Sequence, residues 1–262
     1  MGTSLKTLVK DTLRKFDIGI LRYANLQRLM EENSTARNNI ELILELPEQH
    51  SSRLLRVLNN SKSQVGQDLF VLSELDFKTG GFFVEFGATN GVDLSNSYLL
   101  EKDFGWSGIL AEPAKRWHRN LRANRSCNIE TDCVWRDSHS TLTFNETDLG
   151  EYSTIDSYST SDDHREKRKR GKTYGVKTIS LEDMLDKHHA PKEIDYLSID
   201  TEGSEYEILS NFNFEKYRIR IITCEHNFTP NRENILSLMT QNGYTRKLTN
   251  SSQLDDWYVK TD

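Results

Sequence analysis

The chain has 262 residues, of which 35% are hydrophobic, 28% charged and 10% aromatic. With 14 glycines and 4 prolines, this composition excludes collagen-like and low-complexity chains and provides enough bulk for a folded core. The formal net charge of −6 argues against nucleic-acid binding through the surface as a whole.

Cysteine content and hydropathy indicate the cellular compartment of the protein. Cys127, Cys133 and Cys224 are too few and too scattered for a disulfide framework or a zinc site, which favours a reducing compartment. No run approaches the roughly 18 apolar residues of a membrane span. Charged residues interrupt residues 1–20, unlike the apolar part of a signal peptide. We therefore expect a soluble, cytoplasmic protein without a membrane span.

Residues 1–60 show apolar residues at helical spacing and no strand pattern. The apolar positions are Leu5, Leu8, Val9, Leu13 and Phe16, then Ile40, Ile43 and Leu44 before Pro47, then Leu54, Leu55, Val57 and Leu58. We predict an N-terminal helical region over 1–60 and a main domain over 61–262. The helical region packs on the main domain, completes a lid, or joins two copies in a homo-oligomer.

From residue 64 the pattern alternates between strands and helices. The expected strands are 82–86, 108–112, 129–135, 141–144, 195–199, 219–224, 244–248 and 257–259, and the expected helices are 95–102, 114–123, 205–209 and 234–241. This alternation predicts an α/β fold with an open, mostly parallel sheet and helices on both faces. The last two strands are expected to pair as an antiparallel hairpin at one edge.

A long polar stretch, residues 148–178, interrupts this alternation. Within it, residues 164–172 hold six Lys or Arg and one Glu, which is a local charge of about +5 on an acidic chain. Two interpretations stay open. The stretch is a solvated loop, or it is a mobile lid that attracts an anionic substrate such as a phosphorylated or acidic glycan.

The first predicted strand leads into a glycine-rich turn. It carries Glu85 near its end and continues as Gly87-Ala88-Thr89-Asn90-Gly91. The two glycines permit positive φ and a close approach of the backbone to a nucleotide. About 20 residues beyond Gly91, the next strand ends in Glu112, where an acid accepts hydrogen bonds from ribose hydroxyls. These features fit both NAD and S-adenosylmethionine.

Glu85 favours S-adenosylmethionine over NAD. A pyrophosphate binds bare backbone N–H groups at a helix N-terminus, and a nearby carboxylate repels it. S-adenosylmethionine instead carries an ammonium and a sulfonium group, which a carboxylate attracts. Thr89 also stands where the Gly-x-Gly-x-x-Gly fingerprint needs its second glycine. The alternatives are an NAD-linked oxidoreductase and a non-catalytic nucleotide-binding module on the same fold.

Several short motifs together resemble one known family. They are SQVGQD at 63–68, VEFG at 84–87, SNS at 95–97, GWSG at 105–108, Glu112-Pro113 and, most distinctively, IDTEGSE at 199–205. This set resembles the FkbM family of S-adenosylmethionine-dependent methyltransferases over about residues 63–245. The resemblance implies a class I, Rossmann-like methyltransferase fold with a mostly parallel seven-stranded sheet. It also implies methylation of a hydroxyl group on a sugar, a glycan or a glycosylated natural product.

The resemblance also assigns candidate cofactor residues. Glu85, Gly87 and Asn90 are expected at the methionine end, Glu112 at the ribose and Asp132 at the adenine amino group. The full candidate set for S-adenosylmethionine is Gln67, Glu85, Gly87, Ala88, Asn90, Gly91, Asn96, Glu112, Pro113, Asp132 and Asp200. No nucleic-acid partner is expected; the acceptor is a small molecule or a glycan.

Acids and a histidine follow the fourth and fifth strands of the predicted sheet, where an alkyl hydroxyl could meet a base. The candidate catalytic residues are His226, Asp200, Glu202 and Glu205. His226 is suited to act as a general base, since an unperturbed imidazole has a pKa near 6.5. Glu205 has a second interpretation as the first residue of a helix, where its charge favours the helix N-terminus.

The same strand ends suggest a metal centre. Asp200, Glu225 and Asn227 offer oxygen ligands of the kind that Mg²⁺ or Ca²⁺ binds. The arrangement is similar to that of metal-dependent O-methyltransferases. Without a metal, the carboxylates would repel one another unless one is protonated or paired.

Overall fold

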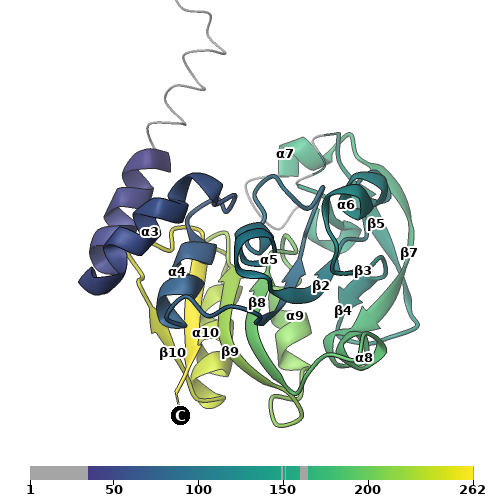
Figure 1. The fold of residues 1–262 in the computed structure, drawn as a ribbon. Coiled ribbons are helices and arrows are strands. Elements are labelled where there is room, and N and C mark those ends of the chain that lie inside the picture. The colour runs from purple at the N-terminus through teal and green to yellow at the C-terminus, as the bar shows by residue number, and fades with distance from the viewer. Residues whose placement is uncertain (1–34, 149, 151, 160–164, 262) are drawn as a thin grey trace, which may run out of the picture.

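The computed structural model describes residues 35–148, 150, 152–159 and 165–261, which form two β-sheets with helices around the larger one (Figure 1). The larger sheet has seven strands in the order β10-β11-β9-β8-β1-β2-β3. Its strands are β1 (Phe82–Phe86), β2 (Ser107–Ala111), β3 (Asn128–Glu130), β8 (Glu193–Ile199), β9 (Arg218–Glu225), β10 (Tyr244–Lys247) and β11 (Asp255–Lys260).

The strand order places a switch point at the centre of this sheet. From β1 the chain moves outward through β2 to β3, and it later returns to the other side of β1 as β8 and β9. β11 lies antiparallel between β9 and β10, so the predicted hairpin forms with β10 at the edge. This confirms the expected α/β fold with a mostly parallel, seven-stranded sheet. Ligands bind at such a switch point, outside the carboxyl ends of the strands.

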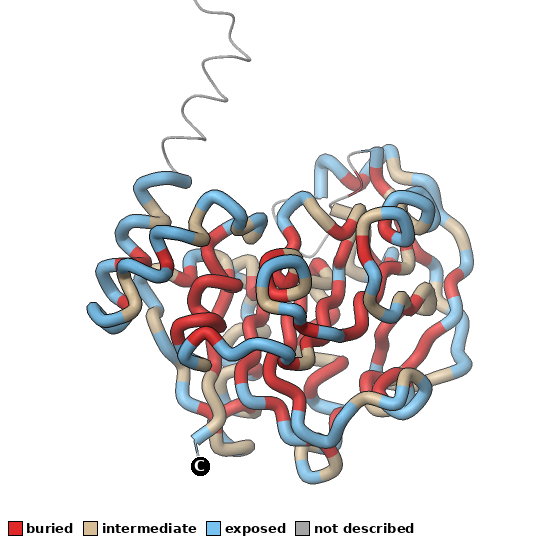
Figure 2. Tube along the Cα trace, viewed as in Figure 1, coloured by how far each residue is buried: buried red, intermediate tan, exposed pale blue. Residues whose placement is uncertain are grey.

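Helices cover both faces of the large sheet. They are α3 (Ser51–Val57), α4 (Gln67–Glu74), α5 (Tyr98–Phe104), α6 (His118–Asn124), α8 (Leu181–Lys187), α9 (Glu205–Ser210) and α10 (Asn231–Gln241). A further short helix, α7 (Arg165–Arg168), lies in the polar stretch 148–178. Neighbouring residues of β1 point to opposite faces. Phe83 packs with side chains of α4, α5 and α6, and Val84 packs with those of α8, α9 and α10. The buried trace in Figure 2 follows the strands accordingly.

The described part of the N-terminal region is helical, as predicted. Residues 35–45 form a helix that ends just before Pro47, and η1 (Glu48–His50), α3 and η2 (Leu58–Asn60) follow. Leu42 and Leu54 are buried against the layer of α4 and α5, whereas Leu44 is 78% exposed. The predicted helical segment from Leu5 to Phe16 lies outside the described residues, and the contact between two copies stays a prediction.

The predicted strand 129–135 was wrong as a single element. It is divided between β3 in the large sheet and β4 (Cys133–Trp135) in the second sheet. The Glu130 carboxylate accepts hydrogen bonds from the backbone N–H groups of Thr131 and Asp132, at 2.9 and 3.0 Å. This tight turn redirects the chain, so that β4 pairs with β7 instead of extending β3.

The polar stretch 148–178 is largely ordered, which the solvated-loop interpretation did not anticipate. It contributes β6 (Thr154–Ile155), η3 (Asp156–Tyr158), α7 and β7 (Lys172–Ser180), and β5 (Thr141–Glu146) completes the second sheet in the order β4-β7-β5-β6. Its own small core contains Phe144, Ile155 and Val176. Among the described residues, no helix has the length and apolar character needed to span a membrane.

Candidate functional site

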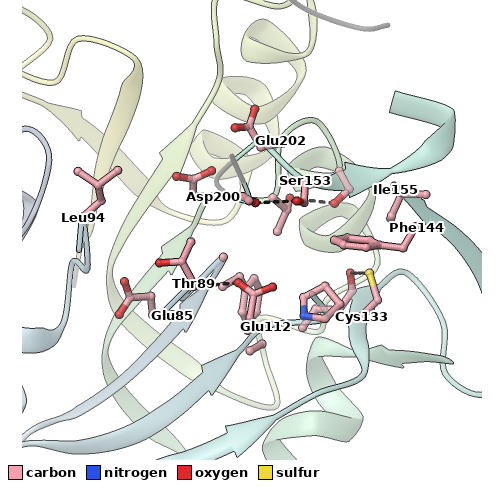
Figure 3. A pocket seen from close by; sticks show the side chains of 18 of the residues that line it. Glu85, Thr89, Leu94, Glu112, Cys133, Phe144, Ser153, Ile155, Asp200 and Glu202 are labelled. Atoms are coloured by element: carbon pink, nitrogen blue, oxygen red, sulfur yellow. Dashed lines mark hydrogen bonds between the residues drawn. The ribbon is translucent and has the colours of Figure 1, made fainter. Parts of the chain in front are cut away.

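A pocket opens between the two sheets, at the carboxyl ends of the large sheet's strands (Figure 3). One wall comes from the tips of β1 and β2 and from residues 93–96. The opposite wall comes from β4, β5 and residues 150–155, and residues 200–204 close one side. The pocket therefore coincides with the switch point of the sheet.

Glu85, from β1, organises the segment that forms one wall of the pocket. Its Oε1 accepts a hydrogen bond from the Asn96 backbone N–H at 2.8 Å. Its Oε2 accepts from the Ser95 hydroxyl at 3.0 Å and from the Ser97 hydroxyl. The carboxylate is only 3% exposed, so these bonds replace the water that it loses.

Arg125 provides the countercharge for Glu85. Its guanidinium lies 4.0 Å from Glu85 and 2.7 Å from Glu101, and its side chain is fully buried. It also donates to the Gly91 carbonyl and to the hydroxyls of Ser95 and Ser97. A network of buried charges and hydroxyls therefore fixes this wall before any ligand binds.

Asn96 carries a buried acceptor without a partner, next to Glu85. Its Nδ2 donates to the Ser198 hydroxyl at 2.9 Å, while its buried Oδ1 has no hydrogen-bond partner among the described residues. Asn96 lines the pocket beside Glu85. A cationic group of a ligand would satisfy this oxygen and lie close to the Glu85 carboxylate.

Gly87 allows the tips of β1 and β8 to approach each other. Its φ is +73°, and a Cβ at this position would lie 2.1 Å from the Asp200 carbonyl oxygen. Gly91, with φ +80°, packs against Leu121 and Arg125, where a Cβ would lie 2.7 Å from each side chain. Both glycines therefore serve close packing as well as positive φ.

Glu112, at the tip of β2, faces Glu85 across the β1 turn (Figure 3). Its two oxygens accept hydrogen bonds from the backbone N–H groups of Thr89 and Ala114, at 2.8 and 2.7 Å. Burial raises the pKa of Glu112 to about 7. The remaining lone pairs of this carboxylate could accept from the two hydroxyls of a ribose.

A second group of acids lies at the tips of β8 and β9. Oxygen atoms of Asp200, Glu202 and Glu225 all lie within 4.8 Å of one another. Loss of water around the carboxyl group raises the pKa of Asp200 to about 7. Burial and the nearby Asp200 carboxylate raise the pKa of Glu225 well above its ordinary value.

Glu202 has partners outside this acid cluster. The Arg168 guanidinium donates to its Oε2 at 2.8 Å, and both side chains are buried. The Asn227 amide also donates to Oε2, at 3.3 Å. Glu202 adopts a φ of +59°, which is uncommon for a residue with a side chain and is found where surrounding contacts enforce it.

The pocket gathers part of the set that the sequence proposed. The candidates that line it are Glu85, Gly87, Asn96, Glu112, Pro113, Asp200 and Glu202. Gln67, Ala88, Asn90, Gly91 and Asp132 do not line it, and neither do Glu205, Glu225, His226 and Asn227. Asn90 and Gly91 instead shape the turn after β1, and Gln67 donates to Asp255 at 2.8 Å.

Two candidate catalytic residues face away from the pocket. The Glu205 carboxylate accepts hydrogen bonds from the backbone N–H groups of Thr201 and Gly203, both at 3.0 Å, and so supports the loop before α9. His226 is 4% exposed, its Nδ1 accepts from the Phe228 backbone N–H at 3.0 Å, and burial lowers its pKa. Neither placement favours contact with a substrate.

Sequence reasoning missed several residues that line the pocket. They are Asp93, Leu94, Cys133, Val134, Phe144, Gly150, Ser153, Ile155, Thr201 and Ser204. Cys133 and Val134 directly follow the candidate Asp132, so the end of the third strand was a usable signal. Phe144, Gly150, Ser153 and Ile155 belong to the second sheet and its connections, for which no motif gave a signal.

The chain was compared with solved structures, with curated proteins and with family models. Solved structures similar to the chain include a precorrin-6y C5,15-methyltransferase from Geobacter metallireducens GS-15 (11% identity, TM-score 0.38, 69% of this chain and 71% of that one). Another is a TehB-like SAM-dependent methyltransferase from Corynebacterium glutamicum ATCC 13032 (8% identity, TM-score 0.38, 82% and 97%). Similarity this low says nothing about the substrate of this chain.

No curated protein matches the sequence. A family model does: the Methyltransferase FkbM domain matches residues 85–246, which is more than half of the chain. The match includes the acids that line the pocket, which are Glu85, Glu112, Asp200 and Glu202. The chain therefore belongs to the FkbM family of S-adenosylmethionine-dependent methyltransferases.

Proposed function

We propose that the protein transfers a methyl group to a hydroxyl oxygen of a sugar, a glycan or a glycosylated natural product. Family membership accounts for the methyl donor, whereas the hydroxyl acceptor is the proposal. The observation that carries it is the Asp200 carboxyl group, which lines the pocket and has a pKa raised to about 7. A hydroxyl group needs such a base near neutral pH, because it is a poor nucleophile while it keeps its proton.

The described residues fit the methyl donor at both ends. Asn96 offers an unsatisfied buried oxygen beside Glu85, which suits the ammonium group of a methionine moiety. The Glu112 carboxylate suits the ribose hydroxyls. When bound, S-adenosylmethionine supplies an electrophilic methyl group on a cationic sulfur.

In the proposed reaction, the pocket holds the acceptor hydroxyl in line with this methyl group. A bond forms between the hydroxyl oxygen and the methyl carbon as the bond from carbon to sulfur breaks, and the sulfur keeps the electron pair. Asp200 accepts the proton that the hydroxyl loses. The Glu225 carboxyl group lies within 4.8 Å of the Asp200 carboxylate and holds it in place.

We propose Mg²⁺ as an alternative way to activate the hydroxyl. Asp200, Glu202 and Glu225 form an all-oxygen cluster of the kind that Mg²⁺ binds, and Glu225 Oε2 has no partner among the described residues. The arrangement favours Glu202 over the predicted Asn227, whose amide nitrogen donates to Glu202. A bound ion would stabilise the oxyanion of the acceptor as a Lewis acid.

The first test is calorimetric titration with S-adenosylmethionine, with and without Mg²⁺. Micromolar binding is expected, and tighter binding with Mg²⁺ would support the metal. No binding under either condition would contradict the site. If Asp200 acts as the base without a metal, Asp200→Asn should retain cofactor binding and lose methyl transfer. The control Asp76→Asn changes an exposed side chain and should retain both cofactor binding and methyl transfer.

The acceptor is tested by transfer of a labelled methyl group to panels of neutral sugars, sugar phosphates and amines. Mass spectrometry after alkali treatment then identifies the product, because a methyl ether survives alkali and a methyl ester does not. A product methylated on nitrogen would contradict the proposed acceptor. Persistent cofactor binding with no transfer to any sugar would favour the non-catalytic module.

A further inference from the structure

Arg168 is a buried residue in a surface segment. The neighbouring basic residues Arg165, Lys167, Lys169 and Arg170 are all exposed, as expected for a charged stretch. The Arg168 side chain, in contrast, is fully buried. Removing a guanidinium from water is unfavourable unless hydrogen bonds and a countercharge replace the water, so its surroundings must compensate.

The compensation comes from three directions. Arg168 Nε donates to the Tyr152 carbonyl at 2.9 Å, and a terminal nitrogen donates to the Tyr158 carbonyl at 3.4 Å. The other terminal nitrogen donates to Glu202 Oε2 at 2.8 Å. The planar guanidinium thus joins both ends of residues 152–158 to one carboxylate at the strand tips.

Residues 152–158 form the wall of the pocket that faces Glu202. Ser153 and Ile155 line the pocket, and the Thr154 hydroxyl donates to the Glu202 carbonyl at 3.0 Å. The Tyr158 ring covers Gly203, where a Cβ would lie 3.0 Å from the ring. Several contacts therefore hold this wall against the loop 200–204, and the ion pair between Arg168 and Glu202 is the charged contact among them.

We propose that Arg168 is a positioning residue of the methyl-transfer site. It fixes residues 152–158 against Glu202 and so completes the pocket next to Asp200. This inference rests on the proposed function, because it gives Arg168 a role in the same site. Lysine could reach Glu202 with a single charged group, but it lacks the planar fork that bonds two carbonyls at the same time.

The test compares Arg168→Met, Arg168→Lys and the control Lys169→Met, whose parent side chain is 66% exposed. The Met variants each remove one tryptic site, so they form a matched pair. The readouts are the rate of tryptic cleavage after Arg165 and Lys167, and the Kd for S-adenosylhomocysteine by calorimetry. Thermal melting checks that each variant folds.

We expect Arg168→Met to increase both the cleavage rate and the Kd about tenfold, Arg168→Lys to restore part of each, and Lys169→Met to change neither. An unchanged cleavage rate in Arg168→Met would overturn the proposal. Faster cleavage with an unchanged Kd would reduce Arg168 to a structural role and would also overturn it. Failure of the unmodified protein to bind S-adenosylhomocysteine would instead contradict the proposed function, and the cleavage rates would still test whether Arg168 docks the wall.

Discussion

The two walls of the pocket are built in different ways. On the wall of the large sheet, Glu85 and Glu112 lie at the ends of short apolar strands and are held by backbone N–H groups close to those strands' ends. On the wall of the second sheet, Phe144 and Ile155 come from paired strands, and Ser153 from the adjoining turn. The first wall is built around acids whose positions at strand ends the sequence pattern marks, whereas the second is built from contacts between segments that no motif marks.

Asn145 illustrates how the second wall depends on such contacts. Its Nδ2 donates to the Ser159 hydroxyl at 2.9 Å and to the Arg168 carbonyl at 3.2 Å. Neither bond corresponds to a recognisable sequence motif. Changes in the first wall should therefore affect cofactor binding most strongly, while changes at the outside of the second should mainly affect local stability.

The largest effect is expected for Glu85→Ala. The change leaves the hydroxyls of Ser95 and Ser97 without their acceptor and the buried Arg125 with less countercharge. Breaking a buried charged network of this kind costs about 3–5 kcal/mol. We expect unfolding in urea at a clearly lower concentration and at least a hundredfold loss of affinity for S-adenosylhomocysteine.

Glu85→Gln separates charge from shape, since it retains one acceptor oxygen and the side-chain volume. We expect it to retain most of the stability and still to lose affinity, because the ammonium group no longer meets a carboxylate. The exposed Glu215→Gln is the control, with no expected change. Affinity close to that of the unmodified protein in Glu85→Gln would remove Glu85 from the cofactor site.

Gly87→Ala is expected to have the next largest effect. The new Cβ would lie 2.1 Å from the Asp200 carbonyl oxygen, and a backbone atom cannot move aside as a flexible side chain can. Gly80 has a similar φ of +65° with open space around it, so Gly80→Ala measures the strain alone. We expect Gly80→Ala to cost about 1 kcal/mol and Gly87→Ala about 3 kcal/mol in urea unfolding. Equal losses of stability in the two variants would show that the tips of β1 and β8 separate easily.

These contrasts explain how far the sequence could predict the molecule. The mostly parallel large sheet and its helices on both faces followed from the alternation of apolar strands with helices, and the acids at the tips followed from their positions after those strands. Of the second sheet, the strand at residues 141–144 was predicted, but Lys172–Ser180 was not, because it interleaves charged and apolar residues and so resembled a loop. The start of α8, which follows this strand, could have been predicted, because Ser180 caps the helix by accepting a hydrogen bond from the Asp183 backbone N–H.

The catalytic assignments show a second limit. Asp200, Glu202 and Glu225 gather because they end neighbouring parallel strands or follow them. His226 directly follows β9, but it is buried next to Asp256 and does not line the pocket. Position along the chain predicts the edge of the sheet, and only packing decides which side chain faces the ligand.

Glu112 gives a pH-dependent prediction of intermediate size. Its pKa is about 7 in the folded protein and near 4.5 when unfolded, so the folded state keeps a proton that the unfolded state releases. Stability from this group is therefore present below pH 4.5 and lost as the pH rises to about 7. Relative to the unmodified protein, Glu112→Gln should become more stable across this range, by on the order of 2 kcal/mol in urea unfolding.

Cofactor binding should show the opposite pH trend. The ribose hydroxyls donate to the ionised carboxylate, so affinity for S-adenosylhomocysteine should rise about tenfold between pH 6 and pH 8 in the unmodified protein. Glu112→Gln should bind weakly and without this rise. Calorimetry at pH 6 and pH 8 measures the affinity of both proteins. An equal rise in affinity in Glu112→Gln would show that a group other than Glu112 titrates.

The smallest effect is expected at the outside of the second wall, for Tyr174→Phe. The Tyr174 hydroxyl donates to Glu146 at 2.6 Å and accepts from the Lys115 N–H at 3.1 Å, which ties β7 to the segment after Glu112. Losing these partly exposed bonds should cost about 1 kcal/mol in urea unfolding. Affinity for S-adenosylhomocysteine should stay within twofold, because Tyr174 does not line the pocket. A tenfold loss would mean that the two walls are coupled through β7, and that the second sheet helps to hold Glu112.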